Sequence, residues 1–201
     1  MYIRVSTSEG VTDVDAVASR LLDLVIGGLK DKKGFRGITA SADRVSGVVS
    51  VLTTWQTEED LTAADTLATD VPQRVRPATA GRLEEFRVYE QLVQELGEKP
   101  PAPGCRIVVT PITMPSTDVD DNIAYFRTEV LPHIRAGRGF RAVQNLIDRQ
   151  SGQGVVGTVW DDESCLDEWM TRAARLRAQG GTRGIEFGEP FRREIILWDL
   201  R

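Results

Sequence analysis

Few residues in this chain could carry out chemistry on their own. The sequence has one histidine, His133, and two cysteines, Cys105 and Cys165. A zinc or iron site built by the protein needs several such ligands close together, so we expect no metal site. A Ser-His-Asp or Cys-His arrangement is equally unsupported, because the neighbours of His133 offer no evident nucleophile. We therefore assign no catalytic residue, and we interpret the histidine as a partner of a helix C-terminus rather than as a base.

Four residues of the second half could instead line a pocket for a small apolar or aromatic molecule. They are Trp169 on the inner face of a predicted helix, Asn145 and Trp160 on predicted strands, and Tyr125 beside an apolar helical stripe. An apolar wall with a few polar groups is typical of such pockets. Each residue also has a structural interpretation, since an indole on a helical stripe usually fills a core and the polar side chains can face solvent. Both interpretations stay open at this point.

The elements that must hold these residues occur twice, with a spacing of 105 residues. Gly34-Phe35-Arg36 recurs as Gly139-Phe140-Arg141 (139 − 34 = 105), and Trp55 recurs as Trp160. Of the 28 positions from Gly34 to Leu61, 12 are identical in the second copy. A period of this length is too long for a solenoid, so it indicates a duplicated domain.

The two copies differ where the second copy is chemically most interesting. Trp169 stands where the first copy has Ala64, and Asn145 stands where the first copy has Ala40. In both pairs the second copy carries the larger and more polar or aromatic group, so we expect any ligand site to lie in residues 105–201. The alternative is that Trp169 fills a volume that a ligand occupies in the first copy.

Each copy predicts the order strand, helix, strand, strand, helix, strand. The first helices are expected to begin at Thr12 and Thr117, each followed three residues later by an aspartate as in a capping box, and to end at Gly34 and Gly139. Pro132 should kink or shorten the second of them. The predicted strands are 2–6, 35–43, 48–55 and 86–93 in the first copy, and 106–110, 140–148, 154–160 and 194–200 in the second.

This order is the ferredoxin-like βαββαβ unit, in which both helices cover one face of an antiparallel sheet. We predict an α+β protein with one such domain at residues 1–95 and another at residues 105–201, joined by a Pro/Gly-rich linker at residues 96–104. The helix-free face of each sheet needs a partner, and its covalent sister is always at high effective concentration. The two domains are therefore expected to form an intramolecular pseudo-dimeric α+β barrel.

The composition excludes several classes of partner. Charged residues make up 27% of the chain, the formal net charge is −5, and both signs are mixed along the sequence. We therefore expect no binding to nucleic acid or to an anionic membrane. No apolar run approaches the roughly 18 residues of a membrane span, and the first residues read as a strand rather than a signal peptide. The two cysteines look like reduced thiols, so we expect a cytoplasmic protein, with self-association left open.

Three motifs of the repeat occur together in one known type of domain. They are the Gly-Phe-Arg opening of the second strand, the Asp-Arg-x-Ser-Gly hairpin at Asp43 and Asp148, and the Trp-x-x-Glu end of the third strand at Trp55 and Trp160. Together they resemble the antibiotic biosynthesis monooxygenase (ABM) domain, over nearly all of both copies. The resemblance implies a dimeric α+β barrel, here within one chain. It also implies several activities, since some ABM-like proteins oxidise polycyclic phenols or quinols with O₂ and no metal or flavin, while others degrade haem.

The cofactor-free activity is the one that the resemblance favours for this chain. In the haem-degrading proteins a tryptophan follows the strand-ending one by nine residues, as Trp169 follows Trp160 (169 − 160 = 9). Neither second helix here contains the histidine that would hold the iron. We therefore expect no cofactor and a monooxygenase of an aromatic or quinol-like substrate. The alternative is a non-catalytic ligand-binding or stress-associated protein of the same fold.

Overall fold

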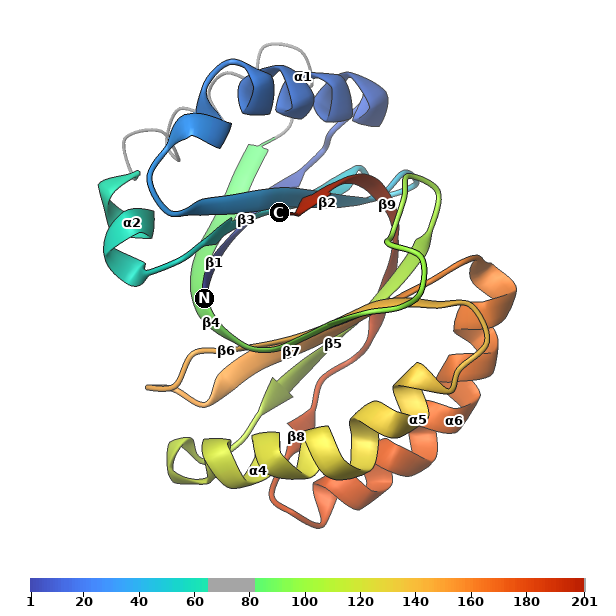
Figure 1. Ribbon diagram of the computed structural model, residues 1–201. Coiled ribbons are helices and arrows are strands. Elements are labelled where there is room, and N and C mark those ends of the chain that lie inside the picture. Colours follow the sequence, from blue (N-terminus) through green and yellow to red (C-terminus); the bar gives the residue numbers. More distant parts are fainter. Residues whose placement is uncertain (65–81, 201) are drawn as a thin grey trace. The chain divides into compact units, whose positions relative to one another are not determined.

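The computed structural model describes residues 1–64 and 82–200 and divides the chain into two compact units (Figure 1). Unit 1 consists of Met1–Val88 and Arg193–Arg201, and unit 2 consists of Tyr89–Arg192. The boundaries between the units fall inside two strands, β4 (Arg82–Leu96) and β9 (Phe191–Leu200). Each of these strands therefore contributes residues to both units.

Unit 1 contains β1 (Tyr2–Glu9), α1 (Val14–Ile26), a 3₁₀ turn (Leu29–Asp31), β2 (Phe35–Asp43), β3 (Val48–Trp55) and α2 (Glu58–Ala63). β3 lies between β1 and β2, and residues 194–200 of β9 pair with β2, all in antiparallel register. Apolar side chains at helical spacing on α1 are buried against this sheet, namely Val14, Val17, Leu21 and Val25. Leu61 of α2 belongs to the same core.

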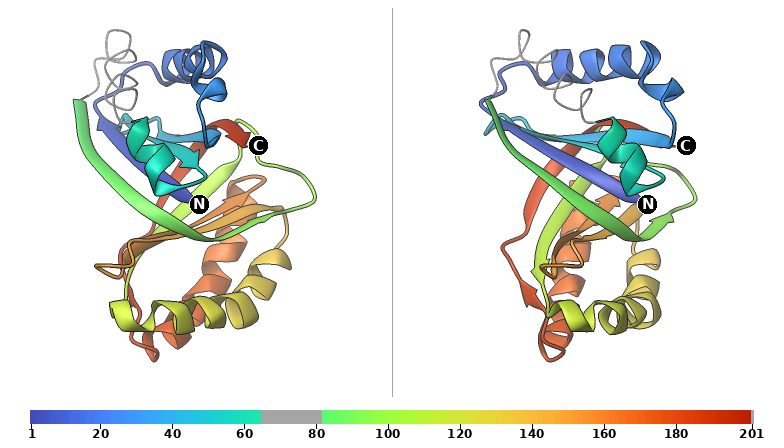
Figure 2. Two further views of the ribbon diagram at one scale, coloured as in Figure 1. Left: turned by 60° about the vertical axis from the view of Figure 1, so that its left-hand side comes forward. Right: turned by 90° about the vertical axis from the view of Figure 1, so that its left-hand side faces the viewer.

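Unit 2 contains β5 (Arg106–Thr113), a 3₁₀ turn (Ser116–Asp118), α4 (Val119–Tyr125), a π-helical turn (Phe126–Val130), α5 (Leu131–Arg135), β6 (Phe140–Ile147), β7 (Gln153–Trp160), α6 (Glu163–Gly181) and β8 (Glu186–Phe187). Its sheet has the order β4-β6-β7-β5-β8, with antiparallel neighbours. The helical segments all cover one face of this sheet (Figure 2). The unit is thus an α+β layer of the ferredoxin-like kind.

The last strand of each sequence copy extends beyond its own half of the repeat. Residues 90–96 of β4, from the first copy, pair with β6 of the second copy, and residues 194–200 of β9 pair with β2 of the first. In a ferredoxin-like sheet the second strand lies at an edge, and an edge exposes a row of unpaired N–H and C=O groups. The extended final strands satisfy those groups. The structural units therefore differ from the predicted domains 1–95 and 105–201.

The Pro/Gly-rich segment 96–104 does not separate the two units. It connects β4 to β5 inside unit 2, where the Gly97 N–H donates to the Arg141 carbonyl at 2.8 Å and the Cys105 N–H donates to the Ala102 carbonyl at 3.1 Å. A Cβ on Gly97 would meet the Phe140 carbonyl oxygen at 2.4 Å. The segment predicted as an interdomain linker thus lies within unit 2 in this division, because composition reports stiffness and turns, and not which sheet the flanking strands join.

The helix ends also differ from their predicted positions. α1 is capped by Asp13, whose Oδ1 accepts from the Ala16 N–H at 2.9 Å, and not by Thr12. α1 ends at Ile26, so Gly34 is not its C-cap; this glycine has φ +73° in the turn before β2. A Cβ there would lie 2.2 Å from the Asp60 carboxylate, so the glycine is needed for close approach.

Pro132 interrupts its helix as predicted. The residues before it form the π-helical turn Phe126–Val130, and α5 begins at Leu131 with the proline in its first turn. Proline has no N–H to donate to the preceding turn, which explains the local change in hydrogen bonding. The helical axis nevertheless continues, so Ile123, Phe126 and Ile134 all remain in the core of unit 2.

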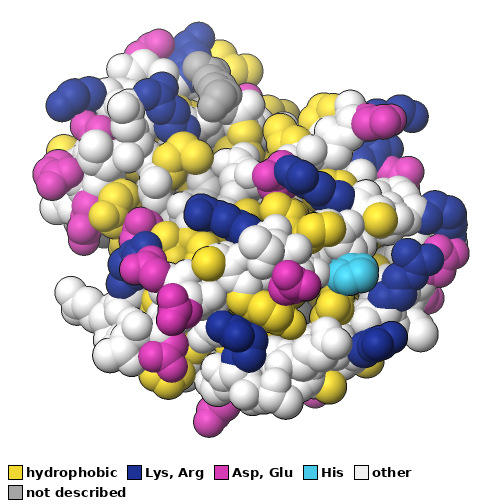
Figure 3. Space-filling view, turned by 60° about the horizontal axis from the view of Figure 1, so that its bottom comes forward, with side chains coloured by type: hydrophobic (Ala, Val, Ile, Leu, Met, Phe, Trp, Pro, Cys, Tyr) yellow, Lys and Arg dark blue, Asp and Glu magenta, His cyan; other side chains and the backbone are white. Residues whose placement is uncertain are grey.

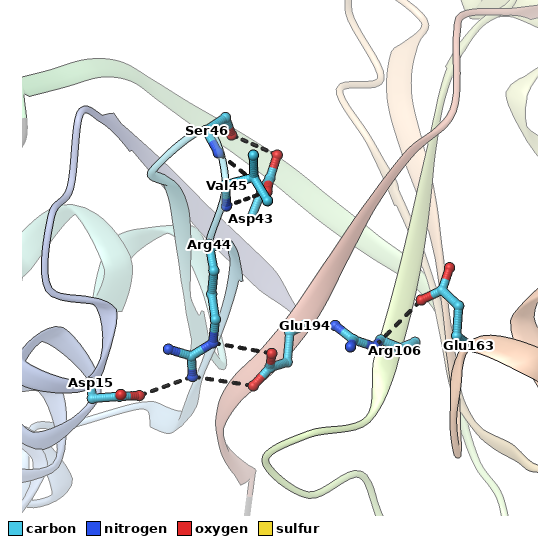
Figure 4. Close-up of polar contacts among 8 residues, drawn as sticks. All are labelled: Asp15, Asp43, Arg44, Val45, Ser46, Arg106, Glu163 and Glu194. Atoms are coloured by element: carbon cyan, nitrogen blue, oxygen red, sulfur yellow. Dashed lines mark hydrogen bonds and ion pairs between the residues drawn. The ribbon is translucent and has the colours of Figure 1, made fainter.

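Each unit contains its own cluster of ion pairs, and the two clusters are centred on arginines at equivalent positions of the repeat. In unit 1, Arg44 Nη2 lies 2.9 Å from Asp15 Oδ1 of α1, and Arg44 Nε lies 3.1 Å from Glu194 Oε2 of β9 (Figure 4). In unit 2, Arg149 pairs in the same way with Asp120 of α4 and Glu90 of β4. The aromatic ends of the third strands match as well, since the Trp55 and Trp160 indoles each donate to a threonine two residues earlier.

The hairpin aspartates predict a pH-dependent contribution to stability. Asp148 accepts hydrogen bonds from the Ser151 hydroxyl at 2.6 Å and the Gln150 N–H at 2.9 Å, and these bonds lower its pKa. Because the folded pKa lies below the unfolded value of about 3.9, the contribution is present above that pH and is lost as the pH falls through the folded pKa. We expect Asp148→Asn to lower the free energy of unfolding at pH 7 and to lose this effect below about pH 4.

Urea denaturation of both proteins at several pH values measures this difference. Asp121→Asn, which removes an exposed acid from α4, is the matched control and should give a small difference from the wild type. A wild-type advantage over Asp148→Asn that stays constant down to pH 3 would contradict the assignment.

No helix within residues 1–64 and 82–200 combines the length and the apolar character of a membrane span.

Candidate functional site

A cavity of about 80 Å³ lies inside unit 2, between the sheet and the helices that cover it. It is partly open to solvent, and its wall combines residues of β5, β6 and β7 with residues of α4, the π-helical turn, α5 and α6. The lining is mostly apolar, and its polar members are Thr110, Asn122, Tyr125, Asn145, Thr158 and Arg177. Such a wall suits a small apolar molecule that is oriented by a few polar contacts.

Asn145 is the most deeply buried amide of the cavity wall. Successive side chains of a strand point to opposite faces, so Asn145 shares the helix-facing side of β6 with the core residues Val143 and Ile147. The side chain is 2% exposed, and its Oδ1 has no hydrogen-bond partner within the described part of the chain. A buried unsatisfied acceptor costs about 1–3 kcal/mol. A donor supplied by a ligand would offset that cost.

Trp169 of α6 forms an aromatic part of the wall. Its ring stacks on the ring of Trp160, with a centroid distance of 5.3 Å and an interplanar angle of 23°. Trp160 is fully buried, donates from its indole N–H to Thr158 Oγ1 at 3.0 Å, and meets Phe140 edge to face. The stack fixes the plane of the Trp169 ring within the cavity wall.

Three residues of the cavity wall, Asn122, Tyr125 and Met114, are linked to Arg183 by a chain of polar contacts. The Arg183 guanidinium lies 4.6 Å from the centroid of the Tyr125 ring, and its Nε donates to Asn122 Oδ1 at 3.2 Å. The Asn122 amide in turn lies 3.7 Å from the Met114 sulfur. These contacts hold the phenol of Tyr125 in place through a cation–π interaction.

The cavity wall, as far as it is described, contains neither His133 nor either of the two cysteines of unit 2. His133 is exposed on α5 and appears on the surface in Figure 3. Cys165, at the start of α6, is buried, and burial raises the pKa of its thiol, as does the neighbouring Asp162. The thiol is therefore protonated at neutral pH. Among the residues described, no group of three or more His, Cys, Asp or Glu side chains is placed to hold a metal ion.

Three of the four pocket residues proposed from the sequence line the cavity, and the fourth does not. Trp169, Asn145 and Tyr125 line this one cavity, although they are distributed over α6, β6 and α4. Trp160 does not line the cavity but supports Trp169 from behind. Arg177 also lines the cavity and was not a sequence candidate. Its spacing was the available signal, because it follows the buried Ala173 by four residues and so lies on the inner stripe of α6.

Comparisons with known proteins place the fold but not the chemistry. No protein-family model matches the chain. Over 181 residues the chain is 25% identical to the uncharacterized protein Rv2557 of Mycobacterium tuberculosis, covering 89% of this chain and 79% of that protein. This relative carries no named activity to compare.

Solved structures resemble the chain over almost its whole length. A provisionally assigned monooxygenase from Fusobacterium nucleatum matches with a TM-score of 0.66 and 15% identity, over 96% of this chain and 91% of the other. An anthrone oxidase-like protein matches with a TM-score of 0.60 and 15% identity, over 96% and 90%. A haem-degrading enzyme from Listeria monocytogenes matches with a TM-score of 0.55 and 11% identity, over 95% and 98%. At such identities these likenesses establish the ferredoxin-like α+β fold and leave the reaction to be argued from the site.

Proposed function

We propose that this protein binds a small hydroxylated aromatic molecule in the cavity of unit 2 and oxidises it with O₂ without a cofactor. The single observation that carries the proposal is the buried Asn145 Oδ1, which lacks a donor and lies in an apolar wall that includes Trp169. A substrate hydroxyl would supply the missing donor, while its ring packs against the stacked indole. Monooxygenase-like structures with the same fold support the reaction type.

The chemistry needs little from the protein because the substrate is itself the reductant. In the oxidation of a ring CH₂ group that is activated by a phenol, the CH₂ becomes C=O, one oxygen atom of O₂ is retained and the other leaves as water. The four electrons that reduce O₂ come from the two C–H bonds of the substrate. The protein contributes by holding the ring, by orienting the hydroxyl and by excluding bulk water.

The size of the cavity limits the ligand. At about 80 Å³ it is roughly half the volume of an engineered 150 Å³ apolar cavity that admits benzene. A ring therefore enters only if it also occupies the open mouth or if a wall side chain moves.

The proposal includes the expectation that the two repeats together form the barrel of ABM-like domains.

A specific observation favours a second candidate, a non-catalytic binding protein. Among the described residues that line the cavity, none is a histidine, a cysteine or a carboxylate. A general base for removal of the substrate proton must then be water or a second substrate group. If no turnover occurs, the same cavity still accounts for the binding of an aromatic molecule.

The test is oxidation of 1,8-dihydroxyanthrone, which carries both the phenol and the ring CH₂ group, by the purified protein, with Asn145→Ala as the decisive variant. We expect O₂ consumption, one ¹⁸O atom from ¹⁸O₂ in the anthraquinone product, and a loss of about tenfold or more in kcat/KM on Asn145→Ala, since a buried hydrogen bond is worth about 1–3 kcal/mol. Gln153→Ala removes an exposed amide from the neighbouring strand and should leave the rate unchanged. Saturable binding without turnover would favour the second candidate, and absence of both would overturn the proposal.

A further inference from the structure

Arg177 is an unusual residue for the wall of an apolar cavity. It lies on the same stripe of α6 as the buried Trp169, Ala173 and Gly180, and it is itself half-buried. The residues three and four positions away on the helix are alanine and glycine, so α6 supplies no carboxylate to pair with it. Within residues 1–64 and 82–200, Arg177 makes no ion pair and no hydrogen bond through its side chain.

A second cation lies next to the cavity wall without lining it. Arg183 contacts Asn122 and the face of Tyr125, and within the described part of the chain it pairs with no carboxylate. No Asp or Glu occurs among the described residues that line the cavity. The chain as a whole carries a formal net charge of −5, so a cavity wall with an arginine and no described acid departs from the general charge of the molecule.

Partly burying a guanidinium without a counter-ion removes part of its hydration, a cost that a bound anion would offset. We infer that the ligand of this cavity is an aromatic acid, whose carboxylate is recognised by Arg177 while its hydroxyl donates to Asn145. This inference rests on the proposed function and specifies its substrate class. Arg177 then acts as a specificity residue, because it selects anionic over neutral aromatics.

The spacing of the residues sets the length of the ligand. Trp169 and Arg177 are eight positions apart on α6 (177 − 169 = 8), which corresponds to about 12 Å along the helix. The arginine side chain can cover part of that distance, and a ring stacked beside Trp169 covers more. A fused two-ring acid with its hydroxyl and carboxylate at opposite ends has a length of this order. Because the cavity of about 80 Å³ is smaller than such a ring system, the ligand must also occupy the open mouth or displace a wall side chain.

The inference is tested by calorimetric titration with two probes of the same shape, 6-hydroxy-2-naphthoate and its neutral amide, 6-hydroxy-2-naphthamide. We expect the acid to bind more tightly than the amide by about tenfold or more, because hydrogen bonds between two charged groups are stronger than those between neutral groups. Arg177→Gln should abolish this preference by weakening only the acid. Arg175→Gln, which removes an exposed arginine from the same helix, should preserve the preference.

The outcomes separate the inference from the function on which it rests. Equal binding of acid and amide, each weakened by Asn145→Ala, would overturn the anion specificity and leave the aromatic site intact. A preference that survives Arg177→Gln would likewise overturn the role of Arg177. If neither probe binds the wild-type protein, both the inference and the proposed aromatic site are overturned.

Discussion

Replacing Trp169 with alanine is expected to lower the free energy of unfolding by about 3–5 kcal/mol. The indole is 7% exposed, stacks on Trp160 at 5.3 Å and belongs to the core cluster of this unit. The truncation removes buried apolar area and leaves a void beside the existing cavity. Urea denaturation monitored by circular dichroism measures the change.

Two further measurements separate packing from binding. Trp169→Phe keeps a ring beside Trp160 and should lose less stability than the alanine variant. Added indole should restore part of the stability of Trp169→Ala, because an apolar cavity of sufficient size binds small aromatic molecules and binding stabilises the folded state. A loss of less than about 1 kcal/mol in the alanine variant would show that the indole is not a packed part of the core.

Gly152→Ala is expected to destabilise the protein by roughly 2–4 kcal/mol. Gly152 has φ +71° at the end of the β6–β7 hairpin, where a residue with a Cβ is strained. A Cβ at this position would lie 1.9 Å from the Met114 carbonyl oxygen, and a backbone atom cannot move aside by rotating a side chain. The Gly152 N–H donates to the Asp148 backbone carbonyl, so a displacement of Gly152 requires the hairpin to shift as a whole.

Gly104→Ala is the matched control for this substitution. Gly104 also has a positive φ, +93°, but a Cβ there would meet nothing within 4 Å. It should therefore cost only the conformational penalty of about 1–2 kcal/mol. Equal losses in the two variants, measured by thermal or urea unfolding, would show that the contact with Met114 relaxes without cost.

Most of the secondary structure followed from local chemistry. β-Branched runs, the Ser-Gly hairpins and the helical stripes predicted the elements at nearly their observed positions. Gly34 and Gly139 have the positive φ that was predicted, but they lie in the turns before β2 and β6 and not at the helix C-caps where they were expected. The errors were local as well. The cap at Asp13 rather than Thr12 shows that neighbouring residues of similar chemistry compete for one helix start, and a spacing rule does not choose between them.

Some residues of the cavity wall could be singled out from the sequence, and the reason is physical. Trp169 and Asn145 were found because they differ from Ala64 and Ala40 at matched positions of the repeat, which singles out residues that symmetry alone does not require. Arg177 was missed because an arginine on a polar-rich helix is ordinarily solvated, and only the packing of α6 against the sheet shows that this one lines a cavity.

By itself the sequence determined the order of elements, the α+β class and the internal repeat, because these depend on periodicity, turn residues and matches at a constant spacing. Only the tertiary structure decided which sheet each final strand completes, that residues 96–104 lie within unit 2, and that Asn145 and Arg177 belong to one cavity. Strand pairing and cavity walls join residues far apart in the chain, and the free energy of those contacts depends on which edges and faces remain unpaired once the layers have formed.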